Sequence, residues 1–364
     1  MDFELSDDQV ALRDGIRDLC AGRFDIDTVR GLADCGGVDR RLWAELADTG
    51  VFSLLVPENE GGVGLGWAEA GLVFEQLGRA LVPGPLVGTL LAAGVVYYDD
   101  HDNEVSVDDE VVGFMERPNG PALVEYPDVI DALLVLDEHG VWRVDAAELS
   151  VEPAQSLDPL TPVGRAAELP QGEQVQSNSY GWANRAVYLC SALQVGLATG
   201  ARELAVAYAK ERRQFDKPIG QFQAVKHKCA DMYSREEVAR AALYYAGCVM
   251  DATHGPGLPA DPSGYLYFEG CMIHLGDPLG DGEHKELVRA VSGARILAAT
   301  AADRNGKDCV QVHGGMGFTW EVDAHLYLKR AWALTPQFGS LDRHADRVAD
   351  SVGTDRHGIG APLG

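Results

Sequence analysis

Hydrophobic residues recur at helical spacing through most of the first hundred positions. Leu12, Ile16 and Leu19 follow one another at intervals of four and three, the spacing of one face of a helix. Ser6 and Gln9 stand just ahead of them in the pattern of a capping box, so we expect a helix to begin directly after Ser6. Three further helical patterns follow, at residues 39–50, 67–81 and 86–96.

The pattern changes between Asp99 and Glu152. This segment holds 16 acidic residues, and Arg117 and Arg143 are its only strong bases. Short valine-rich stretches separated by turn residues replace the helical spacing, and they predict a small antiparallel β unit. A stretch rich in Pro, Gly and Gln, near residues 153–178, is expected to lead out of it.

Helical spacing then returns. Apolar or small residues predict one long helix over residues 183–212, about 43 Å long. Two more long helices are expected at residues 222–251 and 285–312, and a last helical segment through about Val352. We therefore expect a mainly α fold with a small central β domain. Its expected parts are an N-terminal helical domain (1–103), a reduced β domain (104–178), a C-terminal helical bundle (179–353) and a tail (354–364).

The composition narrows the class of partner. The chain has 364 residues and a formal net charge of −26, which argues against nucleic acid and anionic membranes as partners because both attract basic surfaces. No apolar run approaches the roughly 18 residues of a membrane span, and the acidic N-terminus lacks a secretory signal pattern. The seven cysteines are scattered without a CxxC pair. They predict free thiols in a reducing cytoplasm, with no disulfide framework and no zinc site.

One segment differs from this acidic background. Four of the seven lysines lie within residues 210–228, together with Arg212 and Arg213 and opposed only by Glu211 and Asp216. We call residues 210–228 the basic segment. Cations at the end of a helix offset its macrodipole by about 0.3–1 kcal/mol each, which is one explanation. The other is an anion site, because the planar guanidinium of Arg212 can donate paired hydrogen bonds to phosphate.

A second unusual stretch, Q-V-H-G-G-M-G-F, occupies residues 311–318. Adjacent glycines let the backbone come close to a ligand, and they expose N–H groups that can bind phosphate oxygens. The spacing is not the dinucleotide-binding fingerprint, and no strand is expected before it. Considered alone, the stretch is better explained as a plain turn between helices.

Together, the two stretches closely resemble motifs of the acyl-CoA dehydrogenase family. The carrying sequences are E-R-R-Q-F-D-K-P-I-G-Q-F-Q-A-V-K-H-K-C-A-D-M, starting at Glu211, and V-Q-V-H-G-G-M-G-F, starting at Val310. Residues 56–79 also resemble the family's N-terminal glycine-rich loop and the helix after it. The resemblance covers nearly the whole chain and is weakest in the β segment. It implies the family's three-domain fold, with FAD as cofactor.

The resemblance also implies which residues contact FAD. In the family these contacts reach across a subunit interface, so each FAD is held by two chains. The implied residues are Arg212 and Gln214 at the pyrophosphate, Phe215, Phe222 and Gln223 beside the adenosine, and Gln311, Gly314 and Gly315 at the ADP portion. On this interpretation, the basic segment binds the FAD of a neighbouring subunit.

The chain departs from the family at the catalytic base. Family members remove the α-proton of an acyl thioester with a glutamate, found at one of two places. Those places correspond here to Phe338, 27 residues after Gln311, and to Ala186, 26 residues before Arg212. Neither residue can accept a proton.

The strands that hold the flavin ring in the family are not recognisable between residues 104 and 178. About thirty extra residues lie near 253–284.

These departures imply a non-catalytic subunit, similar to those of actinobacterial heteromeric α2β2 enzymes. The partner subunit would supply the glutamate, and the implied substrate is an acyl-CoA, with a sterol side-chain ester as one candidate. Electron-transfer flavoprotein is the implied acceptor.

Three alternatives stay open: an active homomer with a relocated base, a flavin oxidase or monooxygenase that needs no base, and a flavin-free structural partner. Glu321 and Asp342 are the nearest candidates for a relocated base. Trp320, Trp332 and Phe338 are interpreted as packing residues at the vacated active site.

Overall fold

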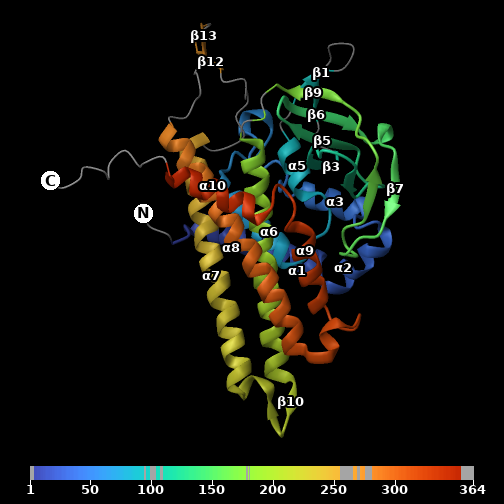
Figure 1. Ribbon diagram of the computed structural model, residues 1–364, viewed down its shortest axis with the longest axis vertical. Helices are drawn as coiled ribbons and strands as arrows, with labels where there is room; N and C mark the ends of the chain where they lie inside the picture. Colours follow the sequence, from blue (N-terminus) through green and yellow to red (C-terminus); the bar gives the residue numbers. More distant parts are fainter. Residues whose placement is uncertain are drawn as a thin grey trace, which may run out of the picture.

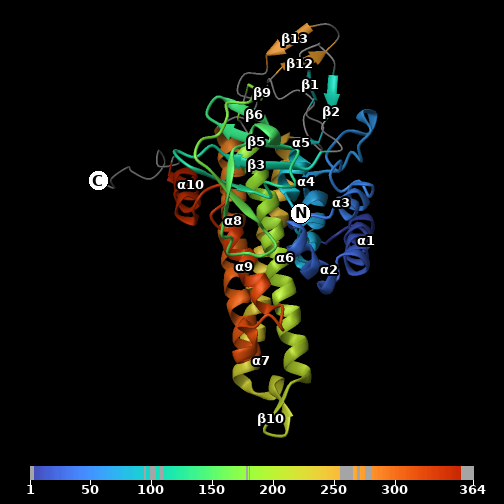
Figure 2. The same cartoon turned by 90° about the vertical axis from the view of Figure 1, so that its right-hand side faces the viewer.

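The computed structural model describes residues 4–93, 96–98, 104–106, 110–177, 179, 181–254, 265–268, 271–274 and 281–353. Three long helices run side by side along the longest axis of the molecule: α6 (Trp182–Glu211), α7 (Gln223–His254) and α8 (Asp281–His313) (Figures 1 and 2). The N-terminal helices and the sheets gather around the upper half of this bundle in Figure 1. The predicted order of helical, β and helical parts is confirmed. The predicted domain boundaries at residues 103 and 178 fall on positions outside the described ranges.

The N-terminal part begins as its sequence predicts. The Ser6 hydroxyl caps α1 (Asp7–Arg23) by accepting a hydrogen bond from the backbone amide of Gln9. The Gln9 side-chain oxygen in turn accepts one from the backbone amide of Ser6. The remaining helices of this part are α2 (Ile26–Leu32), η1 (Ala33–Cys35), α3 (Arg40–Ala47), η2 (Glu58–Glu60), α4 (Trp67–Arg79) and α5 (Leu86–Ala92).

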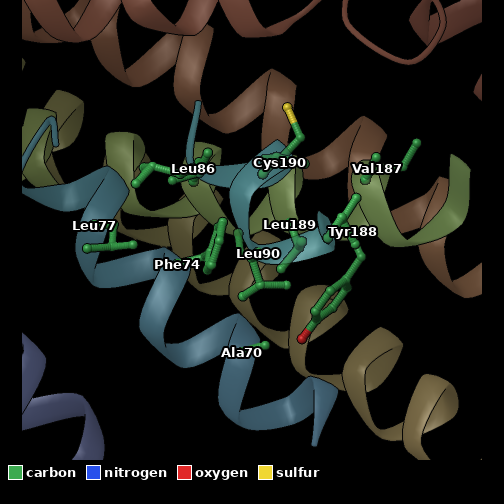
Figure 3. Packing of buried hydrophobic residues seen from close by; sticks show 14 of the residues in the cluster. Ala70, Phe74, Leu77, Leu86, Leu90, Val187, Tyr188, Leu189 and Cys190 are labelled. Atoms are coloured by element: carbon green, nitrogen blue, oxygen red, sulfur yellow. The ribbon is translucent and has the colours of Figure 1, made fainter. Parts of the chain in front are cut away.

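Helices α4 and α6 cross at close range. A Cβ atom on Gly78 of α4 would lie 2.1 Å from the Leu193 carbonyl oxygen, and one on Gly196 of α6 would lie 2.0 Å from the Glu75 carbonyl oxygen. Glycine at both positions therefore permits the crossing. The core spreads from this contact to α5, where side chains of all three helices interdigitate. Figure 3 shows them, among them Phe74, Leu77, Leu90, Val187 and Leu189.

The β part consists mainly of two sheets. One has the order β3-β5-β6-β9, formed by Val112–Glu116, Ala132–Asp137, Gly140–Asp145 and Glu173–Gln176. The other has the order β4-β8-β7, formed by Ala122–Glu125, Val163–Ala166 and Val151–Ala154. The expectation of a purely antiparallel unit is wrong, because β3 and β5 pair in parallel. The intervening strand β4 joins the other sheet, so the chain returns to β5 in the direction of β3.

Shorter elements complete the fold. Strands β1 (Val96–Tyr98) and β2 (Glu104–Ser106) form a ladder before the sheets, and η3 (Ala146–Glu148) follows β6. Within the predicted extra segment at 253–284, the structure describes a ladder of β12 (Tyr265–Phe268) and β13 (Cys271–His274) and the ends of the flanking helices. Among the described residues, no helix is long and apolar enough to cross a membrane.

The last helical segment is divided, contrary to expectation. It consists of α9 (Ala324–Leu334) and α10 (Leu341–Gly353). Between them, Phe338 and Gly339 have φ angles of 57° and 107°, which no α-helix can contain. The turn that separates the two helices therefore includes Phe338, one of the two positions where the family would place its base.

Candidate functional site

The basic segment forms a hairpin at one tip of the helical bundle (Figures 1 and 2). Strand β10 (Arg213–Gln214) follows α6 directly and pairs with β11 (Lys217–Pro218), and η4 (Ile219–Gln221) leads into α7. Phe215 and Asp216, between the strands, have φ angles of 51° and 65°. This geometry favours a two-residue turn with both residues left-handed, a conformation that aspartate tolerates better than most residues.

The cations of this segment differ in what they contact. Arg213 donates to the Asp216 carbonyl oxygen at 2.7 Å, and Lys228 pairs with Asp308 on α8 at 2.5 Å. The ammonium of Lys217 lies 4.3 Å from the centre of the Phe222 ring. Arg212 is exposed, and its side chain makes no hydrogen bond or ion pair with the described part of the chain. Its guanidinium is therefore available to an anionic ligand.

The glycine-rich stretch lies at the same end of the bundle. Tyr208 of α6 stacks on His313 at the end of α8, with 4.2 Å between ring centres, and the Arg212 amide donates to the Tyr208 carbonyl oxygen. The turn η5 (Gly314–Phe318) follows. No described atom lies within 4 Å of where a Cβ on Gly314 or Gly315 would stand, so the backbone there is open to a ligand.

The other predicted contact residues surround these two turns. Gln214, Gln223 and Gln311 are exposed, and the Phe215 side chain is 86% exposed. Phe222 packs edge-on against Phe215 with ring centres 6.1 Å apart. The arrangement suits one end of a large phosphate-bearing cofactor such as FAD, because it combines an unpaired guanidinium, open glycine amides and the exposed Phe215 ring.

A cavity of about 400 Å³ lies away from this tip. Its walls come from α5, strands β3 and β4, and the turn between α9 and α10. Phe338 lines it, and its ring packs at a tilt against Phe114 with 5.5 Å between centres. Ala186, the other position where the family places a base, is fully buried on α6. The structure thus places the side chain of Phe338 in the wall of a cavity.

Glu125, at the end of β4, also lines this cavity and was not predicted. Its Oε1 accepts a hydrogen bond of 2.6 Å from Nε2 of Gln337, the residue before Phe338. Burial raises the pKa of the Glu125 carboxyl to about 7, although Arg330 and the Gln337 amide act in the opposite direction. The sequence gives no local signal of this, since "ALVEYP" reads as an ordinary strand end.

Arg330 of α9 also lines the cavity and forms a buried ion pair with Asp158, in the loop between β7 and β8. Asp158 also accepts from the Leu160 amide at 3.0 Å and the Thr161 hydroxyl at 2.8 Å. Burial alone would lower the pKa of Arg330, but Asp158, Tyr126 and Glu125 together outweigh it and the pKa is raised. Arg330 therefore keeps its charge inside the protein.

The candidates for a relocated base lie elsewhere. Glu321 and Asp342 are both exposed, and neither lines the cavity. Trp320 and Trp332 do not line it either: Trp320 packs edge-on against His325, and the Trp332 indole donates to Asp303 at 2.8 Å. The interpretation of these two tryptophans as packing residues of the vacated site is therefore wrong, because Trp320 lies exposed in the turn before α9 and Trp332 on α9 faces α8.

Comparison with known proteins finds matching family models and relatives. The family model for the acyl-CoA dehydrogenase N-terminal domain matches residues 6–98, and the C-terminal domain model matches residues 184–263 and 279–353. Acyl-CoA dehydrogenase IpdE2 of Mycobacterium tuberculosis is 32% identical over 336 residues, covering 88% of this chain and 89% of IpdE2.

Solved structures share the fold at low sequence identity. The ChsE4–ChsE5 complex of Mycobacterium tuberculosis matches with a TM-score of 0.75 and 22% identity, over 99% of this chain and 100% of that chain. The Tcur3481–Tcur3483 steroid ACAD variant also gives 0.75, with 21% identity over 96% and 98% of the two chains. Two matched domain models and a relative aligned over most of its length show that this chain belongs to the acyl-CoA dehydrogenase family.

Proposed function

We propose that this chain is the non-catalytic subunit of a heteromeric, FAD-dependent acyl-CoA dehydrogenase. The observation that carries the proposal is the contrast between the two ends of the molecule. At the hairpin end of the bundle, Arg212 is exposed and unpaired among the described residues, and the backbone of Gly314 and Gly315 is open. At the cavity, an apolar ring stands where the family places its base. The chain therefore presents groups suited to a cofactor contact and lacks a proton acceptor at the family's positions.

In the proposed complex, this chain holds the ADP half of an FAD that the partner subunit shares. Arg212 and Gln214 would donate to the pyrophosphate, while Gln311 and the amides of Gly314 and Gly315 would meet the ADP portion. Phe215, Phe222 and Gln223 would cover the adenosine. FAD supplies the hydride acceptor, and the partner supplies the glutamate that takes the α-proton. A charge-assisted bond to a phosphate oxygen explains why arginine suits position 212.

Two neighbours of the same fold support a two-protein assembly, since one is named as the ChsE4–ChsE5 complex and the other as Tcur3481–Tcur3483. An α2β2 heterotetramer, with electron-transfer flavoprotein as acceptor, is the form that we propose. The second of these neighbours is named a steroid ACAD, so we propose a sterol side-chain CoA ester as substrate. The exposed positions of Glu321 and Asp342 weigh against an active homomer that uses either as its base.

Replacing Arg212 by alanine should weaken FAD binding in the complex by about 10- to 150-fold. This range corresponds to the roughly 1.5–3 kcal/mol of a hydrogen bond to a charged group. Flavin retained per complex, read from the ratio of visible to ultraviolet absorbance during dilution, measures the loss. Arg213→Ala is the matched control, because Arg213 already donates to the Asp216 carbonyl. Equal FAD affinity in Arg212→Ala and wild type would remove the pyrophosphate assignment.

The chain expressed alone should bind little or no flavin, and co-expression with its partner should restore the yellow colour. The reason is that one chain is expected to supply only the contacts to the ADP half of the cofactor. Flavin content per mole of protein, measured for both preparations, tests this expectation. A stable yellow homomer that dehydrogenates an acyl-CoA would contradict the non-catalytic assignment.

A further inference from the structure

The cavity beside Phe338 has mainly apolar walls. They come from five elements that are distant in sequence: Leu86 and Val87 from α5, Phe114 from β3, Leu123 from β4, Leu193 from α6 and Leu334 from α9. A volume of about 400 Å³ falls in the range of sites that bind small organic molecules. In Figure 1, α5 and β3 lie in the upper half of the molecule, whereas the β10 hairpin forms the bottom tip. The cavity is therefore separate from the proposed FAD contacts of this chain.

Glu125 provides a hydrogen-bonding group that faces this space. Its Oε1 already accepts from the Gln337 amide, and no described residue donates to its Oε2. Because Oε1 is occupied as an acceptor, the proton of the neutral acid belongs on Oε2. Burial raises the pKa of this carboxyl to about 7, so the acid form is populated at neutral pH. A protonated Glu125 offers one O–H donor to a molecule in the cavity.

The charged groups near Glu125 already have oppositely charged partners. Arg330 on α9 pairs with Asp158 through its Nε, although its buried Nη2 has no hydrogen-bond partner among the described residues. At the end of β3, Arg117 pairs with Asp137, and Glu116 pairs with Arg343. Two further titratable neighbours, Tyr126 on the same segment and Cys190 on α6, have pKa values that burial raises, so both are neutral near pH 7. An ionised ligand would therefore find no unpaired opposite charge in the cavity while Glu125 is protonated. A neutral ligand would meet no such penalty.

We propose that this cavity binds a neutral, mainly apolar molecule with one carbonyl oxygen, and that the carboxylic acid of Glu125 donates a hydrogen bond to that oxygen. The Glu125 acid thus favours ligands that carry a hydrogen-bond acceptor, and the apolar walls favour ligands with a hydrocarbon skeleton. A ketone has the required chemistry, because its oxygen accepts but cannot donate. Ionisation of Glu125 replaces the donor by a charge that repels the carbonyl oxygen, so binding is lost as pH rises through the pKa. This inference does not depend on the flavin assignment, because the two sites share no residue.

The test is binding of 2-adamantanone to the full-length chain, co-expressed with its partner where it needs one, by calorimetry between pH 5.5 and 8.5. For an acid with a pKa of about 7, the protonated fraction falls roughly tenfold between pH 6 and pH 8. We expect the affinity to fall by the same factor. The alcohol 2-adamantanol, which can also donate to the ionised carboxylate, should show a much smaller fall.

Two substitutions and a control sharpen the test. Glu125→Gln keeps an N–H donor at all pH values, so it should bind the ketone with a flat pH profile. Glu125→Leu should bind it weakly throughout. Glu116→Gln, at another carboxylate of the same wall, should keep the wild-type profile. Failure of the ketone to bind, pH-independent binding by wild type, or an unchanged profile in Glu125→Gln would each overturn the proposal.

Discussion

In the proposed heteromer, replacing the partner subunit's glutamate by glutamine should lower turnover by a factor of about 10²–10⁴, the usual contribution of a general base. The reason is that this chain has no acidic residue at either position where the family places its base. Phe338 presents an apolar ring to the cavity, and Ala186 is fully buried. Single-turnover reduction of the flavin by the acyl-CoA is the appropriate measurement, since it isolates the chemical step from reoxidation.

Three substitutions in this chain serve as controls. Glu321→Gln and Asp342→Asn should leave the rate of flavin reduction unchanged, because both side chains are exposed and neither lines the cavity. Phe338→Ala should act through packing, with at most about 3–5 kcal/mol of lost stability. If the complex with the substituted partner kept near wild-type turnover, this chain would have to contain the base. Glu125 would then be the first residue to replace, because it lies in the cavity wall with Phe338.

The elements that could be predicted are those whose signals are local. Ser6 and Gln9 specify the start of α1 within four residues, and helical spacing identified α6, α7 and α8 nearly to their ends. The parallel pairing of β3 with β5 could not be predicted in this way. The parallel pairing arises because β4 pairs in the other sheet. Tertiary packing determines that pairing, and no residue in the turn signals it.

The candidate site also has a part that the sequence could predict and a part that it could not. The motifs around Arg212 and Gln311 could be recognised because each is continuous in sequence, and the structure brings both to one end of the bundle. Glu125 could not be recognised, since its hydrogen-bond partner Gln337 lies 212 residues further along the chain. The raised pKa is a property of burial, which the strand pattern does not reveal.

The turn that carries Gln337 and Phe338 is contacted by one fully buried arginine. Arg295 of α8 is fully buried, and its guanidinium donates to the carbonyl oxygens of Leu334 at 2.6 Å and Gln337 at 2.9 Å. It also donates to Oε1 of Gln194 at 2.8 Å. No carboxylate forms an ion pair with it among the described residues. The negative end of the α9 macrodipole, at Leu334, compensates part of its charge.

Arg295→Met should therefore destabilise the protein by at least about 3 kcal/mol. Methionine fills most of the volume but donates no hydrogen bond, and each buried acceptor left without a donor costs about 1–3 kcal/mol. Urea unfolding followed by circular dichroism measures the change, with Arg289→Met as the control because Arg289 is exposed on the same helix. The freed Gln337 carbonyl would also release the turn that holds Glu125, so the folded variant should bind 2-adamantanone more weakly. A loss of stability below about 1 kcal/mol would show that the turn between α9 and α10 holds its shape without this cation.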